Sequence, residues 1–230
     1  HAAAVGDVPM VKTLLEFGAD PNARGKDKIA RTALILTAAG GHSEVVKTLV
    51  AKGAELEARD SSGKTALNWA AMRKRTDMVE LLLDKGADIN SRDNGGVSPL
   101  LFAVGRRDTA TMQLLVRRGA DLEVESKQNK MTPLLLAIET GQRDSVAYLL
   151  DKGAQVNGKN GDGLTPLMSA SEKGDSKLVK LLLEHGADPG AEDNRGRTAA
   201  TRAEQQGQQA IVEMLARSLS ESPLDSSSDK

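Results

Sequence analysis

Apolar residues recur along most of the chain with a helical rather than a strand period. Val45, Val46, Leu49 and Val50 stand at i, i+1, i+4 and i+5, and the same spacing returns 33 residues later. Such residues share one face of a helix that turns by about 100° per residue. A shorter apolar stretch precedes each of these segments and begins with Ser or Thr, often followed by Pro, as in Thr132-Pro133. Ser or Thr at the N-cap with Pro at the first helical position starts a helix. The pattern therefore predicts pairs of short helices, each buried on one face.

Two markers repeat in phase along the chain. Gly-Ala followed by a polar residue begins at Gly18, Gly53, Gly86, Gly119, Gly153 and Gly186. The Ser or Thr caps stand at Thr32, Thr65, Ser98, Thr132, Thr165 and Thr198. Self-similarity at a period of 33 to 35 residues is the signature of a repeat architecture. The glycine supplies a left-handed end to the second helix, and a loop rich in Asn, Asp, Lys and Gly leads to the next unit.

Several motifs recur in the same order within each complete unit. They are Thr-Pro-Leu, a helix of small residues, Gly-His or Gly-Asp, Val-Val-x-x-Leu-Leu and Gly-Ala-Asp-x-Asn. This order resembles the ankyrin repeat from residue 1 to about residue 217. The resemblance implies an all-α repeat solenoid, an ankyrin-like stack of helix-turn-helix repeats with β-hairpin fingers. It also implies a concave surface of fingers and first helices, where ankyrin proteins usually bind other proteins.

One element of the family pattern is missing throughout. The usual His after Thr-Pro-Leu is replaced by Ile35, Asn68, Leu101, Leu135, Met168 and Thr201. We therefore expect the hydrogen-bonding role of that His to be unavailable. The first loop, from Asp20 to Thr32, is also longer than the others.

We predict one ankyrin-repeat domain over residues 1–217. Its seven repeats would be 1–31 (partial), 32–64, 65–97, 98–131, 132–164, 165–197 and 198–217. The last is predicted to be a C-terminal cap, because end repeats need a polar outer side; its polar residues are Arg202, Glu204, Gln205, Gln206, Gln208 and Gln209. Residues 218–230 are rich in Ser and Asp and are predicted to be disordered. The chain starts in what looks like the middle of a helix, so we expect residues upstream. An N-terminal targeting signal cannot be assessed, and a cytoplasmic location is the expectation.

Composition narrows the possible chemistry. The chain has no cysteine, which excludes disulfides, thiolate catalysis and Cys-based zinc sites. No apolar run approaches the eighteen residues of a membrane span. His42 and His185 occupy turn and cap positions, and the Gly-rich segment 158–163 falls at a finger tip without the spacing of a phosphate loop. We therefore predict a protein that is not an enzyme and has no cofactor and no metal.

A candidate binding surface follows from the helical wheel of the first helices. With the Ser or Thr cap as position 0, positions 2, 5, 6 and 9 share the buried face, and positions 4 and 8 should point into the groove. Aromatic and Arg residues dominate binding hot spots. The candidate contacts are Leu36, Trp69, Met72, Arg73, Phe102, Arg106, Leu136 and Thr140. Weaker candidates at the finger tips are Lys28, Arg31, Lys64, Asn94, Asn129, Met131 and Arg197. The competing interpretation is that position 4 packs against the finger and that the arginines are solvated charge.

The leading hypothesis is a monomeric, non-catalytic module that binds a partner protein or peptide, possibly through an acidic segment with apolar anchors. The alternative is a regulatory or targeting domain of a larger enzyme, channel or secreted effector. Nucleic acid is a weaker third option. Arg73, Lys74, Arg75, Arg106 and Arg107 form a local basic patch, but a formal net charge of −1 and an aromatic content of 2% argue against it.

Overall fold

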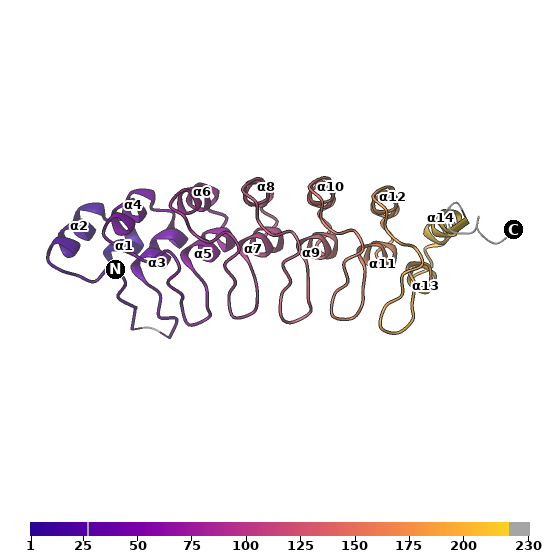
Figure 1. Cartoon of the computed structure of the whole chain (residues 1–230), viewed down its shortest axis with the longest axis horizontal. Helices are drawn as coiled ribbons and strands as arrows, with labels where there is room; N and C mark the ends of the chain where they lie inside the picture. Colours follow the sequence, from indigo (N-terminus) through magenta and orange to yellow (C-terminus); the bar gives the residue numbers. More distant parts are fainter. Residues whose placement is uncertain (27, 221–230) are drawn as a thin grey trace, which may run out of the picture. The chain divides into compact units, whose positions relative to one another are not determined.

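The computed structural model describes residues 1–26 and 28–220, which form two compact units (Figure 1). In the first unit, His1–Lys127, the helices are α1 (Ala2–Val5), α2 (Val8–Glu16), α3 (Ala33–Gly40), α4 (Ser43–Ala51), α5 (Ala66–Met72), α6 (Thr76–Asp84), α7 (Pro99–Gly105) and α8 (Thr109–Arg117). In the second unit, Gln128–Lys230, they are α9 (Pro133–Glu139), α10 (Arg143–Asp151), α11 (Pro166–Glu172), α12 (Ser176–Glu184), α13 (Ala199–Gln205) and α14 (Gln209–Ser220). Each predicted repeat holds one helical hairpin, so the all-α repeat fold is confirmed.

The first helices begin where the sequence predicts. The hydroxyl of each Ser or Thr cap accepts a hydrogen bond from the backbone N–H three residues later, as in Ser98 with Leu101 at 3.2 Å. Asn68 adds a reciprocal bond, because its Oδ1 accepts the backbone N–H of Thr65 at 3.0 Å while its amide donates to the Ser91 carbonyl at 3.1 Å. In this repeat the Asn68 amide therefore makes hydrogen bonds at the position where the family usually has His.

The buried face of the first helices is also as predicted. Leu67 and Leu100 in the first unit, and Leu134 and Leu167 in the second, are each 1% exposed. Within the first unit, α3 packs on α4 and α5, α5 packs on α6 and α7, and α6 packs on α8. Within the second, α11 packs on α9, α12 and α13. Each hairpin thus buries its apolar face on its neighbours, as a repeat stack requires.

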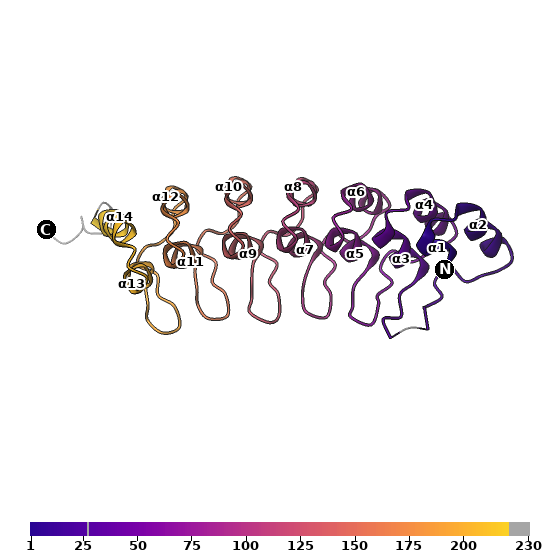
Figure 2. The same cartoon turned by 180° about the vertical axis from the view of Figure 1, so that it is seen from behind.

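The fingers are loops that project from the ends of the hairpins (Figures 1 and 2). Among the described residues they contain one isolated antiparallel bridge, Arg24 to Thr32, and no longer strand. Their shape comes from tight turns, such as Asp60 N–H to the Lys64 carbonyl at 3.0 Å. Neighbouring fingers are also joined by backbone bonds, including Asn94 N–H to the Ser62 carbonyl at 3.0 Å. The predicted β-hairpin fingers therefore form as hydrogen-bonded turns rather than as extended ladders.

The C-terminal prediction needs two corrections. Helix α14 continues to Ser220, past the predicted domain end at residue 217, and residues 221–230 of the predicted disordered tail lie outside the described residues. Arg202, expected among the polar residues of the outer face, is only 7% exposed. It donates to a carboxylate oxygen of Asp193 at 2.6 Å and to Glu172, because it reaches toward the finger rather than into solvent. That the two units form one domain stays a prediction.

Candidate functional site

The predicted binding residues divide between the two units. The first unit holds Leu36, Trp69, Met72, Arg73, Phe102 and Arg106, and the second holds Leu136 and Thr140. Leu136 and Thr140 are half-buried, and the Thr140 hydroxyl donates to the Leu136 carbonyl at 2.6 Å. The candidate site is therefore described on the first unit, where the other residues lie on α3, α5 and α7 or directly after them. The contacts of Leu136 and Thr140 with a partner stay predictions.

Trp69 is less exposed than an open anchor would be. Its side chain lies on α5 with the residue 8% exposed, and its indole N–H donates to Asp60 Oδ2 at 2.8 Å. The guanidinium carbons of Arg31 and Arg73 each lie 5.5 Å from the ring centroid, within the range of a cation–π contact. Trp69 therefore contacts the guanidinium groups of both Arg31 and Arg73. Its bond to Asp60 fits the competing interpretation, in which position 4 packs against the finger.

Asp60 is the residue that sequence reasoning missed. Its Oδ1 accepts hydrogen bonds from the Ser62 N–H at 2.8 Å, the Ser62 hydroxyl at 2.7 Å and the Lys64 N–H at 3.0 Å. Burial opposes ionisation, but the bonds from Ser62, Lys64 and Trp69 outweigh it and lower the pKa of the carboxyl. The signal was present in the sequence, because Asp recurs five residues before the cap at Asp60, Asp93 and Asp193.

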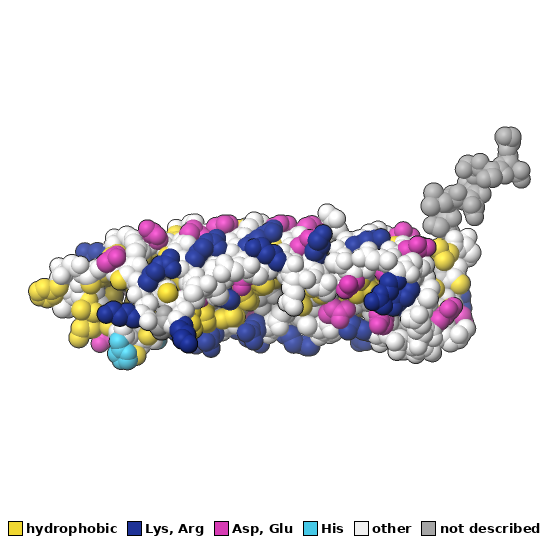
Figure 3. Space-filling model, turned by 90° about the horizontal axis from the view of Figure 1, so that it is seen from below, with side chains coloured by type: hydrophobic (Ala, Val, Ile, Leu, Met, Phe, Trp, Pro, Cys, Tyr) yellow, Lys and Arg dark blue, Asp and Glu magenta, His cyan; other side chains and the backbone are white. Residues whose placement is uncertain are grey.

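Phe102 on α7 is half-buried. The Lys64 ammonium lies 5.7 Å from the ring centroid and 3.1 Å from a carboxylate oxygen of Asp93. Leu36 and Met72 are half-buried as well. The surface seen from below shows hydrophobic side chains with basic ones next to them (Figure 3). The arrangement suits a partner with apolar side chains and carboxylates.

Arg73 and Arg106 occupy position 8 and are exposed. Within the described residues, no carboxylate lies within ion-pair distance of either guanidinium; Arg73 contacts the Trp69 ring. The second unit differs at the same register, because Lys173 pairs with Glu139 at 3.1 Å. Arg73 and Arg106 therefore differ from Lys173 in having no carboxylate partner among the described residues.

Most of the weaker finger-tip candidates are occupied by the fold itself. Asn94 donates to the Ser61 carbonyl at 3.2 Å, Asn129 accepts the Gly161 N–H through its backbone carbonyl at 3.0 Å, and Met131 contacts the Asn160 amide at 3.9 Å. Arg197 pairs with Asp193 at 2.9 Å. Lys28 is exposed. Asn94, Asn129, Met131 and Arg197 therefore have contacts within the fold, as do Arg31 with Trp69 and Lys64 with Asp93.

The described residues contain no group of three His, Cys, Asp or Glu side chains that could hold a metal, and no helix that could span a membrane. His42 lies against the Ala4 carbonyl at 3.2 Å, and His185 against the Leu181 carbonyl at 2.9 Å, in the turn and cap positions assigned to them from the sequence. Both contacts are structural.

Comparison with known proteins gives a consistent family. The family model for ankyrin repeats (three copies) matches residues 1–93, 91–160 and 155–223. The crystal structure of the ankyrin repeat domain of Bcl-3, described as a unique member of the IkappaB protein family, is similar with a TM-score of 0.84 and 29% sequence identity. That likeness covers 94% of this chain and 96% of the Bcl-3 chain. No curated protein matches the sequence. The family model spans nearly the whole chain and agrees with the observed hairpins and fingers, so this chain belongs to the ankyrin repeat family.

Proposed function

We propose that the chain is a non-catalytic, monomeric interaction module that binds a partner polypeptide on the first-helix and finger surface of its first unit. Ankyrin repeats are general protein–protein interaction modules, and no enzyme family is indicated by the comparisons. The observation that carries the proposal is the group formed by Trp69, Arg31 and Arg73, in which an aromatic ring holds two cations at the surface. Phe102 with Lys64 extends the same pattern to the next repeat.

The partner would carry apolar residues next to carboxylates. Half-buried Leu36, Met72 and Phe102 offer apolar contact, while Arg73 and Arg106 offer charge-assisted hydrogen bonds. Aromatic and Arg side chains of this kind supply most of the binding energy of protein interfaces. The Bcl-3 likeness supports a common scaffold, whereas the partner of a scaffold is set by its surface side chains.

A pull-down from the native source tests the proposal. The baits are the parent chain, an Arg73→Ala/Phe102→Ala variant, and a control Lys47→Ala/Glu44→Ala variant that removes an exposed pair on α4. Trp69 is left intact because its replacement would also release Asp60. All three baits are first shown to be folded by circular dichroism.

A protein retained by the parent and the control but lost by the Arg73→Ala/Phe102→Ala variant supports the proposed surface, and titration of that purified protein by calorimetry gives the affinity change. Equal retention by all three baits contradicts the surface. A substrate turned over by the purified chain, with the activity lost on a point change that preserves the fold, contradicts the non-catalytic assignment.

A further inference from the structure

The turns between first and second helices contain a residue in the left-handed backbone region at position 9. In the second unit this residue is always glycine, namely Gly141, Gly174 and Gly207 with φ of 68°, 73° and 69°. In the first unit, two consecutive turns have Lys74 and Arg107 instead, with φ of 56° and 55°. A side chain with a Cβ is strained in this region, whereas glycine is not. Strain of this kind clusters at functional positions.

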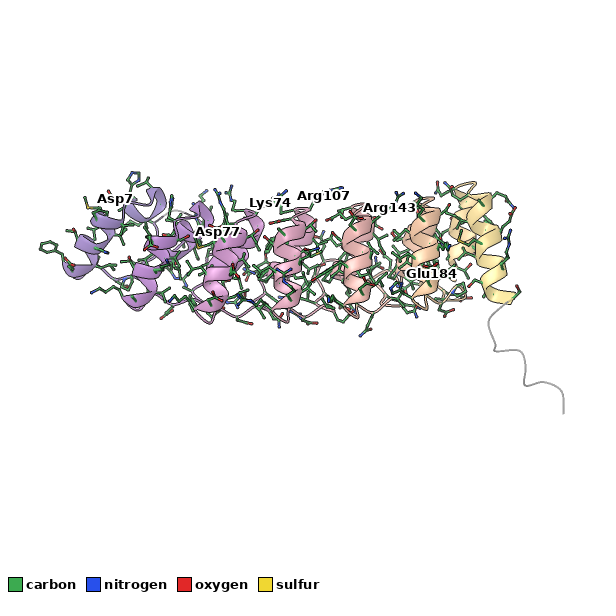
Figure 4. All side chains as sticks on the ribbon, turned by 90° about the horizontal axis from the view of Figure 1, so that it is seen from above. Asp7, Lys74, Asp77, Arg107, Arg143 and Glu184 are labelled. Atoms are coloured by element: carbon green, nitrogen blue, oxygen red, sulfur yellow. The ribbon has the colours of Figure 1, made fainter. Side chains whose placement is uncertain are left out.

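The two strained residues belong to a dense group of cations. Arg73 and Arg75 flank Lys74, and Arg106 precedes Arg107. We call these five residues the turn-edge cations. Lys74 and Arg107 lie at the same edge, at the ends of their hairpins, whereas Asp77 lies further along its helix (Figure 4). All five are exposed.

Four of the turn-edge cations are not neutralised within their own unit. No carboxylate of the described chain lies within ion-pair distance of Arg73, Lys74, Arg75 or Arg106. The nearby Asp108 is engaged in capping α8, since its Oδ1 accepts the Thr111 N–H at 3.2 Å. Other cations of the unit are paired, such as Arg118 with Asp84 at 2.8 Å. The positive charge at the turn edge is therefore concentrated and open to solvent.

The second unit has one cation at positions 8 to 10 of its turns, and that cation is paired within the unit. Lys173, at position 8, pairs with Glu139, at position 7 of the preceding repeat, at 3.1 Å. The first unit has Ala39, Met72 and Gly105 at position 7. The first unit therefore has no carboxylate at the register that supplies the partner of Lys173 in the second unit.

We propose that the turn-edge cations are a docking surface for an acidic polypeptide segment, and that Lys74 and Arg107 are kept in place of glycine for this contact. The proposal rests on the proposed function and adds the residues that select the partner by charge. A polypeptide is favoured over nucleic acid for two reasons. The first unit is close to neutral, with 19 Lys and Arg against 17 Asp and Glu, and Trp69 is buried rather than open for base stacking.

The test uses a variant that should fold at least as well as the parent. Lys74→Gly/Arg107→Gly removes two charges and relieves two strained residues, so its thermal midpoint should not fall. The matched control is Lys85→Gln/Arg117→Gln, which removes two exposed charges from the same two repeats at the opposite ends of α6 and α8. The probe is a fluorescein-labelled peptide of four Glu-Glu-Leu repeats, with a Gln-Gln-Leu counterpart, and the readout is fluorescence anisotropy at low ionic strength.

We expect the acidic peptide to bind the parent and the control alike and the Gln peptide to bind neither. The glycine variant should bind the acidic peptide about three- to tenfold more weakly, as the loss of two exposed charge pairs predicts. Equal binding by parent and glycine variant, or no binding of the acidic peptide to the parent, would overturn the inference. So would a twelve-residue oligothymidylate that binds the parent more tightly than the peptide does. If the pull-down partner is lost by Arg73→Ala/Phe102→Ala but retained by the glycine variant, the proposed function stands and this inference fails.

Discussion

Replacement of Asp60 should reveal how the finger is fastened to the next helix. In Asp60→Ala, the buried indole N–H of Trp69 loses its acceptor, which costs about 1–3 kcal/mol, and the two half-buried backbone N–H groups of Ser62 and Lys64 lose theirs at about 0.5–1 kcal/mol each. The free energy of unfolding should therefore fall by about 2–5 kcal/mol. Chemical denaturation followed by circular dichroism at 222 nm measures this loss.

The milder change Asp60→Asn separates the two parts of that cost. An Asn keeps one oxygen for the turn but presents an amide donor to the indole N–H. The second unit shows that Asn suits the turn, because Asn160 accepts the N–H groups of Asp162 at 2.9 Å and Leu164 at 3.0 Å where position 4 is Ser169. Asp60→Asn should therefore cost less than Asp60→Ala, with the loss confined to the indole contact.

A double-mutant cycle with Trp69→Phe tests this reasoning. Without an indole N–H, the cost of Asp60→Asn should shrink by about 1–2 kcal/mol relative to the cost in the parent. An equal cost of Asp60→Asn in both backgrounds would show that the Trp69 bond is not what Asp60 contributes. Circular dichroism is needed here because Trp69 is the only tryptophan in the sequence.

Two further predictions concern the core and the last finger. Leu100→Ala, at a residue 1% exposed, should lower the free energy of unfolding by about 2–5 kcal/mol, and a loss below about 1 kcal/mol in urea melts would contradict its place in the core. Asp193→Asn should destabilise the chain at pH 7 but not at strongly acidic pH. Burial opposes ionisation of Asp193, yet the hydrogen bonds from Arg197, Arg202 and Arg195 outweigh it and lower its pKa. The ionised carboxylate therefore stabilises the fold above the unfolded pKa of about 3.9, and this stabilisation is lost as the pH falls below it. Denaturant midpoints of both chains across pH check this, and a difference that does not change with pH would refute it.

The candidate site was only partly predictable. The helical wheel predicted that Trp69, Arg73, Phe102 and Arg106 point into the groove. In the structure Arg73 and Arg106 are exposed and Phe102 is half-buried, whereas Trp69 is buried and contacts Arg73. The wheel could not show that Trp69 donates a hydrogen bond to Asp60. That bond joins α5 to the finger nine residues earlier, and it depends on how the loop folds back. The wheel also could not show which arginines lack a carboxylate, since the ion pairs reach from one repeat to the next.

The repeat itself was fixed by the sequence, because its markers are local. A Ser or Thr cap, a Pro at the first helical position and an apolar face at helical spacing act over a few residues, so the helices and the buried Leu67 and Leu100 could be predicted without coordinates. Tertiary structure decided what depends on distant residues: the turn-like fingers, the burial of Arg202 against Asp193, and the open charge of Lys74 and its neighbours. The physical reason is that burial and charge pairing depend on side-chain contacts between neighbouring repeats. The helical period of the sequence does not specify those contacts.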